Sequence, residues 1–149
     1  MKRKLLLSLV LFAGLIFSAS YSHAQTSTTR SQLQYKGSSK KLGAMVADVL
    51  HFNIIVETLE LLKLKENGMT FEIVMVGKLA KEIVEDPKLR EGIDRSEKAG
   101  AKLVVCEYAL DLFKVDKSKL DKRISKTPNA FLYMFELNDR GYNTITVIP

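Results

Sequence analysis

The sequence is poor in the residues that mark several common kinds of protein. It has no tryptophan, three prolines and one cysteine, Cys106. A single cysteine cannot form a disulfide within the chain, so a hydrophobic core has to stabilise the fold. The thiol is therefore buried and inert, paired with another molecule, or reactive.

Motifs for several chemistries are also missing. No glycine-rich phosphate loop follows an apolar run, and Gly77-Lys78 stands alone. A G-x-S-x-G serine signature is absent. Cys106 and His51 are too far apart in the sequence to make a convincing metal site. We therefore expect neither a metal site nor an organic cofactor.

The chain also has only a small excess of positive over negative charge outside its first residues. The formal net charge is +6, and three of the basic residues are Lys2, Arg3 and Lys4 at the start of the chain. Elsewhere lysines alternate with acids along the expected helices, which is typical of a solvated surface. We expect no nucleic-acid partner.

The N-terminus has the pattern of a secretory signal peptide. Three basic residues precede an apolar run over residues 5–17, and Ser22-His23-Ala24 gives a small-x-small exit. The run is short for a membrane span, although an uncleaved anchor is the alternative. We predict a signal peptide over residues 1–24, cleavage after Ala24, a periplasmic or secreted protein, and no stable membrane insertion after cleavage.

The remaining chain divides into a leader and one domain. Residues 25–40 are rich in Ser, Thr and Gln and predict a disordered leader, whereas 41–149 has the length and apolar content of one domain. Apolar runs and helical patterns alternate through the domain. Strands are expected at 41–48, 70–77, 102–106, 123–125 and 142–148. Helices are expected at 51–68, 79–84, 86–100, 107–113, 116–120, and from a cap at Thr127-Pro128 to before Gly141.

This alternation predicts the fold class. Strands that are apolar throughout and separated by helices indicate a parallel sheet covered on both faces. We expect an α/β three-layer sandwich of about five mostly parallel strands with helices on both faces. In such sheets ligands gather at the carboxyl ends of the strands, near the point where strand order reverses.

Cys106 is expected at such a carboxyl end, directly before a helix. Free amides and the helix dipole at this position favour the thiolate, which is the nucleophile, whereas the neighbouring Glu107 disfavours it. Free cysteines are also among the most often buried residues. A reactive thiol and a core residue therefore remain equal alternatives at this stage.

His51 follows the first expected strand, and Asp48 is expected to cap the helix that contains it. In a sheet of order 2-1-3 the first and third strands are neighbours, and His51 and Cys106 would share a crevice. An imidazole there could shuttle the proton of the thiol. The alternative is a surface histidine near a helix start.

The segment from Phe71 to Ile124, with "AGAKLVVCE" and "LFKVDKSKL", followed by "PNAFLYMFELNDRGYNTITVIP", resembles the DsrE/DsrF-like family. More narrowly, it resembles the exported branch of that family that bears signal peptides. The resemblance covers residues 41–149. It implies a compact DsrE-like, flavodoxin-like domain that forms homo-oligomers, often trimers or hexamers.

In the sulfur-handling members of that family, a cysteine at the end of this strand carries a persulfide between partner proteins. The resemblance therefore implies that Cys106 receives sulfane sulfur from a donor and passes it to an acceptor. Two alternatives stay open: an oligomeric binding module with an inert cysteine, and an enzyme that uses a Cys106–His51 pair. The pair requires the two side chains to lie within hydrogen-bond reach.

Overall fold

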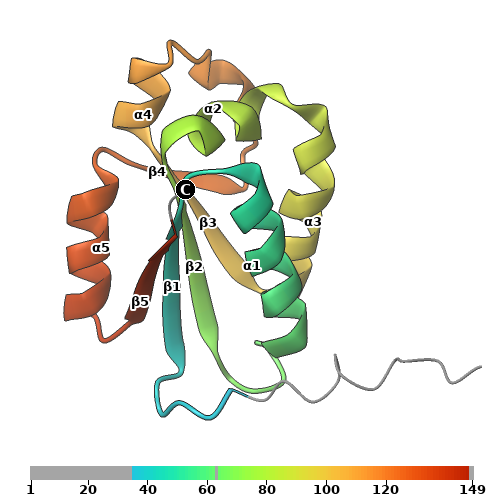
Figure 1. Cartoon of the computed structure of the whole chain (residues 1–149), viewed down its shortest axis with the longest axis vertical. Coiled ribbons are helices and arrows are strands. Elements are labelled where there is room, and N and C mark those ends of the chain that lie inside the picture. Colours follow the sequence, from blue (N-terminus) through green and yellow to red (C-terminus); the bar gives the residue numbers. More distant parts are fainter. Residues whose placement is uncertain (1–34, 63, 148–149) are drawn as a thin grey trace, which may run out of the picture.

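The computed structural model describes residues 35–62 and 64–147, which form a five-stranded sheet flanked by helices (Figure 1). The predicted signal peptide and residues 25–34 of the predicted leader lie outside the described residues. Residues 35–40 form neither a helix nor a strand. The strands are β1 (Lys41–Val46), β2 (Thr70–Met75), β3 (Ala101–Cys106), β4 (Ile124–Thr127) and β5 (Asn143–Val147).

Helices alternate with these strands in the predicted order. They are α1 (Val49–Leu62), α2 (Gly77–Glu85), α3 (Arg90–Ala99), α4 (Glu107–Leu112) and α5 (Ala130–Asp139), with short 3₁₀ turns η2 (Pro87–Leu89) and η3 (Lys117–Lys119). The longest helix described, α1, has 14 residues. Within the described residues, no helix has both the length and the apolar character that a membrane crossing requires.

Side-chain caps explain where several helices begin. The Asp48 carboxylate accepts a hydrogen bond from the His51 N–H at 3.0 Å, as predicted for this cap. Asp86 caps the 3₁₀ turn that leads into α3 by accepting from the Lys88 N–H at 2.9 Å. Gly100 ends α3 in a left-handed conformation with φ 92°, which glycine adopts without steric strain.

The predicted cap of the last helix is wrong. Thr127 is the last residue of β4 and pairs with Cys106 of β3, so it is part of the sheet. Asn129 is the cap instead, because its side-chain oxygen accepts from the Phe131 and Leu132 N–H groups that α5 leaves unpaired.

The sheet confirms the predicted α/β sandwich, and every strand pair described is parallel. Its order is β4-β3-β2-β1-β5, so β2 separates β1 from β3 and the 2-1-3 order is not found. The chain steps in one direction from β1 to β4 and then returns to place β5 beside β1. Strand order therefore reverses at β1, not at β3.

Helices cover both faces of the sheet. Crossovers are right-handed, so those that step from β1 to β4 place their helices on one face, and the returning crossover places α5 on the other. Accordingly, α1 packs against α3, and α5 packs on β1 and β5 (Figure 1). The α4 helix follows the carboxyl end of β3 and packs against α2.

Candidate functional site

Cys106 is the last residue of β3, as predicted, and it is a free thiol. Its backbone is extended and it occupies the N-cap position of α4, without a side-chain hydrogen bond to the helix. The first N–H groups of a helix have no partner within that helix, so donors gather around this position. The thiol therefore lies where the sequence placed it, between a strand end and a helix start.

The thiol points to the side of the sheet that α5 covers. The Tyr133 hydroxyl of α5 bonds Glu72 and Lys102, which are neighbours on β2 and β3. Side chains alternate along a strand, so Cys106, four residues after Lys102, lies on the same face. The α1 and α3 helices cover the opposite face.

Burial limits access to this thiol. Cys106 is only 6% exposed, and the strand residues before it, Val104 and Val105, are almost fully enclosed. The α4 helix, which follows directly, has six residues, of which only Ala109 and Leu110 are buried. The thiol is therefore largely enclosed, and the segment that follows it is a short helix with few buried residues.

Glu107, the acid expected to disfavour a thiolate, has a partner. Its carboxylate forms an ion pair with Lys126 of β4, with Oε1 and Nζ 3.3 Å apart. The pair is partly exposed, so it is screened by solvent. The ammonium nonetheless places a positive charge close to the acid that adjoins the thiol.

His51 lies at the same edge of the sheet but at another strand. Its ring Nδ1 is 2.6 Å from Oδ2 of Asp48, whose other oxygen caps α1. Hydrogen bonds from His51 lower the pKa of Asp48 below its usual range. The ring is thus held by the acid that precedes α1.

The structure does not bring His51 and Cys106 together. Because β2 lies between β1 and β3, the two strand ends are roughly 10 Å apart. His51 belongs to α1 on one face of the sheet, whereas Cys106 points to the face of α5. No hydrogen bond joins the two side chains in the described part of the chain. The shared crevice depended on the 2-1-3 order, which is not found.

Sequence reasoning missed a second cluster, which is centred on Glu72. This acid is 4% exposed within an otherwise apolar strand, and it accepts a 2.6 Å hydrogen bond from the Tyr133 hydroxyl. Lys102 Nζ lies 3.3 Å away and Arg140 Nη1 3.8 Å away. Burial raises the pKa of Glu72, but hydrogen bonds from Tyr133 and Tyr142 and the charge of Lys102 outweigh burial and lower it.

The signal for this cluster was an acid in the middle of the apolar run "TFEIVM". Such a residue requires partners, because an unpaired buried charge is strongly unfavourable. Each of these partners comes from β3, α5 or the turn after α5, so the cluster joins this helix to the sheet. We interpret it as a stabilising network.

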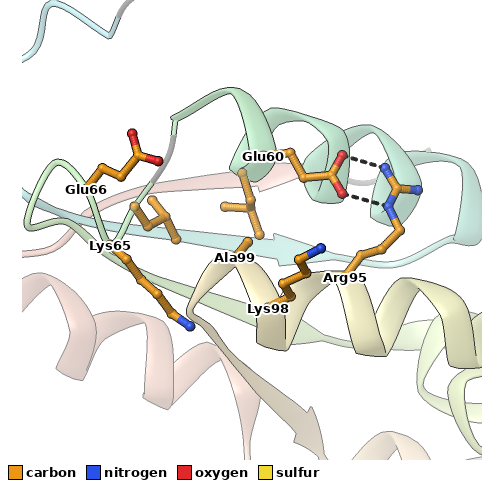
Figure 2. Close-up of a pocket in the computed structure, with 8 residues that line it drawn as sticks. Glu60, Lys65, Glu66, Arg95, Lys98 and Ala99 are labelled. Carbon is orange, nitrogen blue, oxygen red and sulfur yellow. Dashed lines mark hydrogen bonds and ion pairs between the residues drawn. The ribbon is translucent and has the colours of Figure 1, made fainter.

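A pocket of about 390 Å³ opens between α1 and α3, near the amino ends of the strands. Figure 2 shows Arg95 and Glu60 facing one another across its rim, joined by two hydrogen bonds of 2.8 Å. This pair raises the pKa of Arg95. The pocket lies at the opposite end of the sheet from Cys106, away from the edge where parallel sheets gather chemistry.

The described residues contain no group of three or more His, Cys, Asp and Glu side chains arranged to hold a metal ion. The Asp48–His51 pair supplies two such side chains, and the thiol stands apart from them.

Solved structures similar to this chain have its fold. A protein of unknown function from Methanobacterium thermoautotrophicum, MTH1491, superposes with a TM-score of 0.64 at 11% identity, over 72% of this chain and 98% of that one. A conserved protein of unknown function from Bacteroides thetaiotaomicron, BT1422, superposes with a TM-score of 0.60 at 16% identity, over 72% of this chain and 95% of that one. No protein-family model matches the chain. No curated protein matches it either.

Proposed function

We propose that this protein carries sulfane sulfur as a persulfide on Cys106. The observation that supports the proposal is a free thiol at the carboxyl end of a buried parallel strand, directly before a helix. This edge of a parallel sheet is where ligands and reacting groups gather. The resemblance of the surrounding segment to DsrE/DsrF-like proteins leads to the same residue.

The chemistry is a transfer of neutral sulfur between thiolates. The Cys106 thiolate attacks the outer sulfur of a polysulfide, and the S–S bond beside that sulfur breaks. A polysulfide dianion one sulfur shorter leaves with the electron pair, and Cys106 becomes a persulfide. An acceptor thiolate then attacks the outer sulfur of Cys106 and releases the original thiolate. Neither step needs an external oxidant, a reductant or an organic cofactor.

Access to the thiol is the physical requirement of this proposal. A side chain that is 6% exposed does not meet a donor freely. However, α4 contributes only Ala109 and Leu110 to the core, and segments with few buried contacts open at low free energy. We propose that donor and acceptor reach Cys106 when α4 opens locally.

The proposal assigns the reacting group to Cys106 alone. His51 is bonded to Asp48 at the end of β1, and β2 lies between it and the thiol. An enzyme based on a Cys106–His51 pair would require direct hydrogen bonding, so we do not propose it.

We also propose where the protein is located and that it forms an oligomer. The basic and apolar pattern of residues 1–24 supports export to the periplasm or secretion. The resemblance supports a homo-oligomer, a trimer or hexamer, with protein or small-molecule donors and acceptors of sulfur.

Intact-mass measurement tests the carrier role. After incubation with polysulfide and removal of excess reagent, the wild-type protein is expected to gain about 32 Da per sulfur. Addition of a small acceptor thiol should remove that mass. Cys106→Ser is the matched control, because it replaces one atom and should gain nothing. An unchanged wild-type mass under native conditions would end the proposal.

A second candidate is an oligomeric binding module in which Cys106 only fills the core. The 6% exposure of the side chain favours it, because free cysteine often packs as a small apolar residue. It predicts slow reaction of Cys106 with a thiol reagent in the folded protein and fast reaction after unfolding. Persulfide formation at rates near those of an exposed thiol would exclude it.

A further inference from the structure

The pocket between α1 and α3 has an apolar floor and a charged rim. Leu59 of α1, Leu64 in the turn after it and Ala99 at the end of α3 form the floor. Charged side chains of the two helices and of the same turn line the rim (Figure 2). The volume of about 390 Å³ lies within the range of small-molecule sites, which are mostly apolar with a few placed polar groups.

The acids of the rim do not neutralise its two lysines. Glu60 is engaged by Arg95 through two hydrogen bonds of 2.8 Å. Figure 2 shows the Glu66 carboxylate on the α1 side of the pocket and directed away from α3, whereas the Lys98 ammonium points from α3 toward α1. Within residues 35–62 and 64–147, neither the Lys65 nor the Lys98 ammonium makes an ion pair or a hydrogen bond.

The two helices that end at this pocket have caps of their own. The last carbonyl groups of a helix lack partners within it and carry partial negative charge, which a lysine can offset. At the end of α1, the Asn67 side chain donates to the Leu62 carbonyl at 2.7 Å. At the end of α3, the Gly100 N–H donates to the Ser96 and Glu97 carbonyls. The two ammonium groups are therefore left for another partner.

Gly100 places the Lys65 side chain beside the pocket. A Cβ at residue 100 would lie 3.0 Å from Lys65 Cε and 3.1 Å from its Cγ, so the lysine stem occupies the space that a side chain would fill. Figure 2 shows the Lys65 and Lys98 ammonium groups on either side of Ala99. Two cations from different elements thus flank the apolar floor.

A neighbouring hollow between the same helices has the opposite balance of charge. It has a volume of about 250 Å³, shares Glu60 and Arg95 with the pocket, and is otherwise lined by Glu57 and Leu61. Its lining thus has two acids and one base, whereas the lining of the pocket has three bases and two acids. An organic anion is therefore favoured in the pocket and disfavoured in the neighbouring hollow.

We propose that this pocket binds a small organic anion with an apolar body, of the class of medium-chain carboxylates. The apolar body lies on the floor of the pocket, and the carboxylate accepts a hydrogen bond from the Lys98 ammonium beside the charge of Lys65. At roughly 30 Å³ for each water-sized group, about 390 Å³ holds about a dozen such groups. The proposal does not depend on persulfide chemistry at Cys106, which lies at the opposite end of the sheet.

Titration with octanoate, followed by the NMR shifts of the backbone amides, tests the proposal on protein purified after expression of the full chain. Octanoate should cause saturable shifts at the end of α1 and the end of α3, with a Kd of about 1 mM or tighter for a ligand of this size. Octylammonium has the same apolar chain with a positive charge. It should bind at least about tenfold more weakly.

A charge reversal on the rim tests the role assigned to the lysine. Lys98→Glu should weaken octanoate binding by about tenfold or more and strengthen octylammonium binding. Lys122→Glu is the matched control, because Lys122 is an exposed lysine in the turn before β4, away from the lining of the pocket. This variant should bind octanoate as the wild type does.

Four results would overturn the proposal. The first two are the absence of saturable shifts at about 10 mM octanoate, and shifts confined to the exposed apolar residues of α4 and α5. The third is equal binding of octanoate and octylammonium, which would leave apolar contact alone. The fourth is equal weakening by Lys98→Glu and Lys122→Glu, which would show a response to net charge only. The first three are measured on the wild type, so they hold even if a variant fails to fold.

Discussion

Two ten-residue helices, α3 and α5, lie on opposite faces of the sheet and differ sharply in their outer sides. The α3 helix presents Arg95, Asp94 and Glu97, and each of them makes an ion pair with a neighbouring element. The α5 helix presents Phe131, Leu132 and Phe135 to solvent. Their inner sides are alike, because each buries a few residues against the same sheet.

The inner sides of the two helices contribute to folding in the same way, and only their outer sides differ. Burial of an inner side stabilises the fold in both helices, whereas the outer side of α3 is charged and that of α5 is apolar and exposed. Cys106 points to the α5 side of the sheet, so the reactive-group candidate and the apolar surface occupy the same region of the molecule.

The largest effects should come from the inner sides, where the helices do not differ. Leu137→Ala in α5 and Ile93→Ala in α3 each remove buried contacts, since the two residues are 0% and 3% exposed. We expect each to reduce the free energy of unfolding by about 2–5 kcal/mol in urea titrations. A loss below about 1 kcal/mol in either variant would mean that the helix does not pack as described.

The buried acid under α5 should give the next largest effect. Tyr133→Phe removes the hydroxyl that donates to Glu72 at 2.6 Å and leaves the aromatic ring in place. We expect the free energy of unfolding to fall by about 1–3 kcal/mol, as for other hydrogen bonds to charged groups. Tyr108→Phe is the matched control on an exposed ring and should change nothing. Equal effects of the two substitutions would refute the network.

The same acid should make stability depend on pH. The pKa of Glu72 is lowered in the folded protein, so its charged form stabilises the fold above the pKa of the unfolded chain, near 4.5. This contribution is lost as pH falls through the folded pKa. The stability difference between wild type and Glu72→Gln should therefore be present at neutral pH and shrink below pH 4.5. A difference that is constant with pH would contradict the charge-based explanation.

The smallest effect should come from the outer side of α3. Arg95→Gln breaks the pair with Glu60, which joins α3 to α1 on a partly exposed surface. Exposed ion pairs contribute little, so we expect a loss of less than about 1 kcal/mol, reduced further by added salt. A loss above about 2 kcal/mol would show that the outer side of α3 also carries folding energy.

Local patterns predicted the elements but not their arrangement. Asp48, Asp86 and Gly100 mark helix ends through short-range hydrogen bonds and backbone preference, and these signals are readable in the sequence. The order of strands is not, because apolar parallel strands resemble one another and tertiary pairing selects their neighbours. The expectation that His51 and Cys106 meet depended on that order.

In the candidate site, too, the sequence predicted local features but not which residues pack together. The position of Cys106 at a strand end followed from the sequence, while its burial depends on tertiary packing around the end of β3. Glu72 was visible as an acid in an apolar run, but its partner Tyr133 is 61 positions away. Thr127 was predicted to cap α5 from its place before Pro128. In the structure Thr127 pairs with Cys106 of β3, and Asn129 caps the helix instead.

The most direct test of the carrier role is the rate at which Cys106 of the folded protein gains sulfur from polysulfide, measured at urea concentrations below the unfolding transition. If α4 opens locally, little new surface is exposed, and the logarithm of the rate should rise with a slope well below that of global unfolding. A rate that rises with the full slope of global unfolding would mean that the thiol reacts only in the unfolded chain, and it would contradict the proposed function.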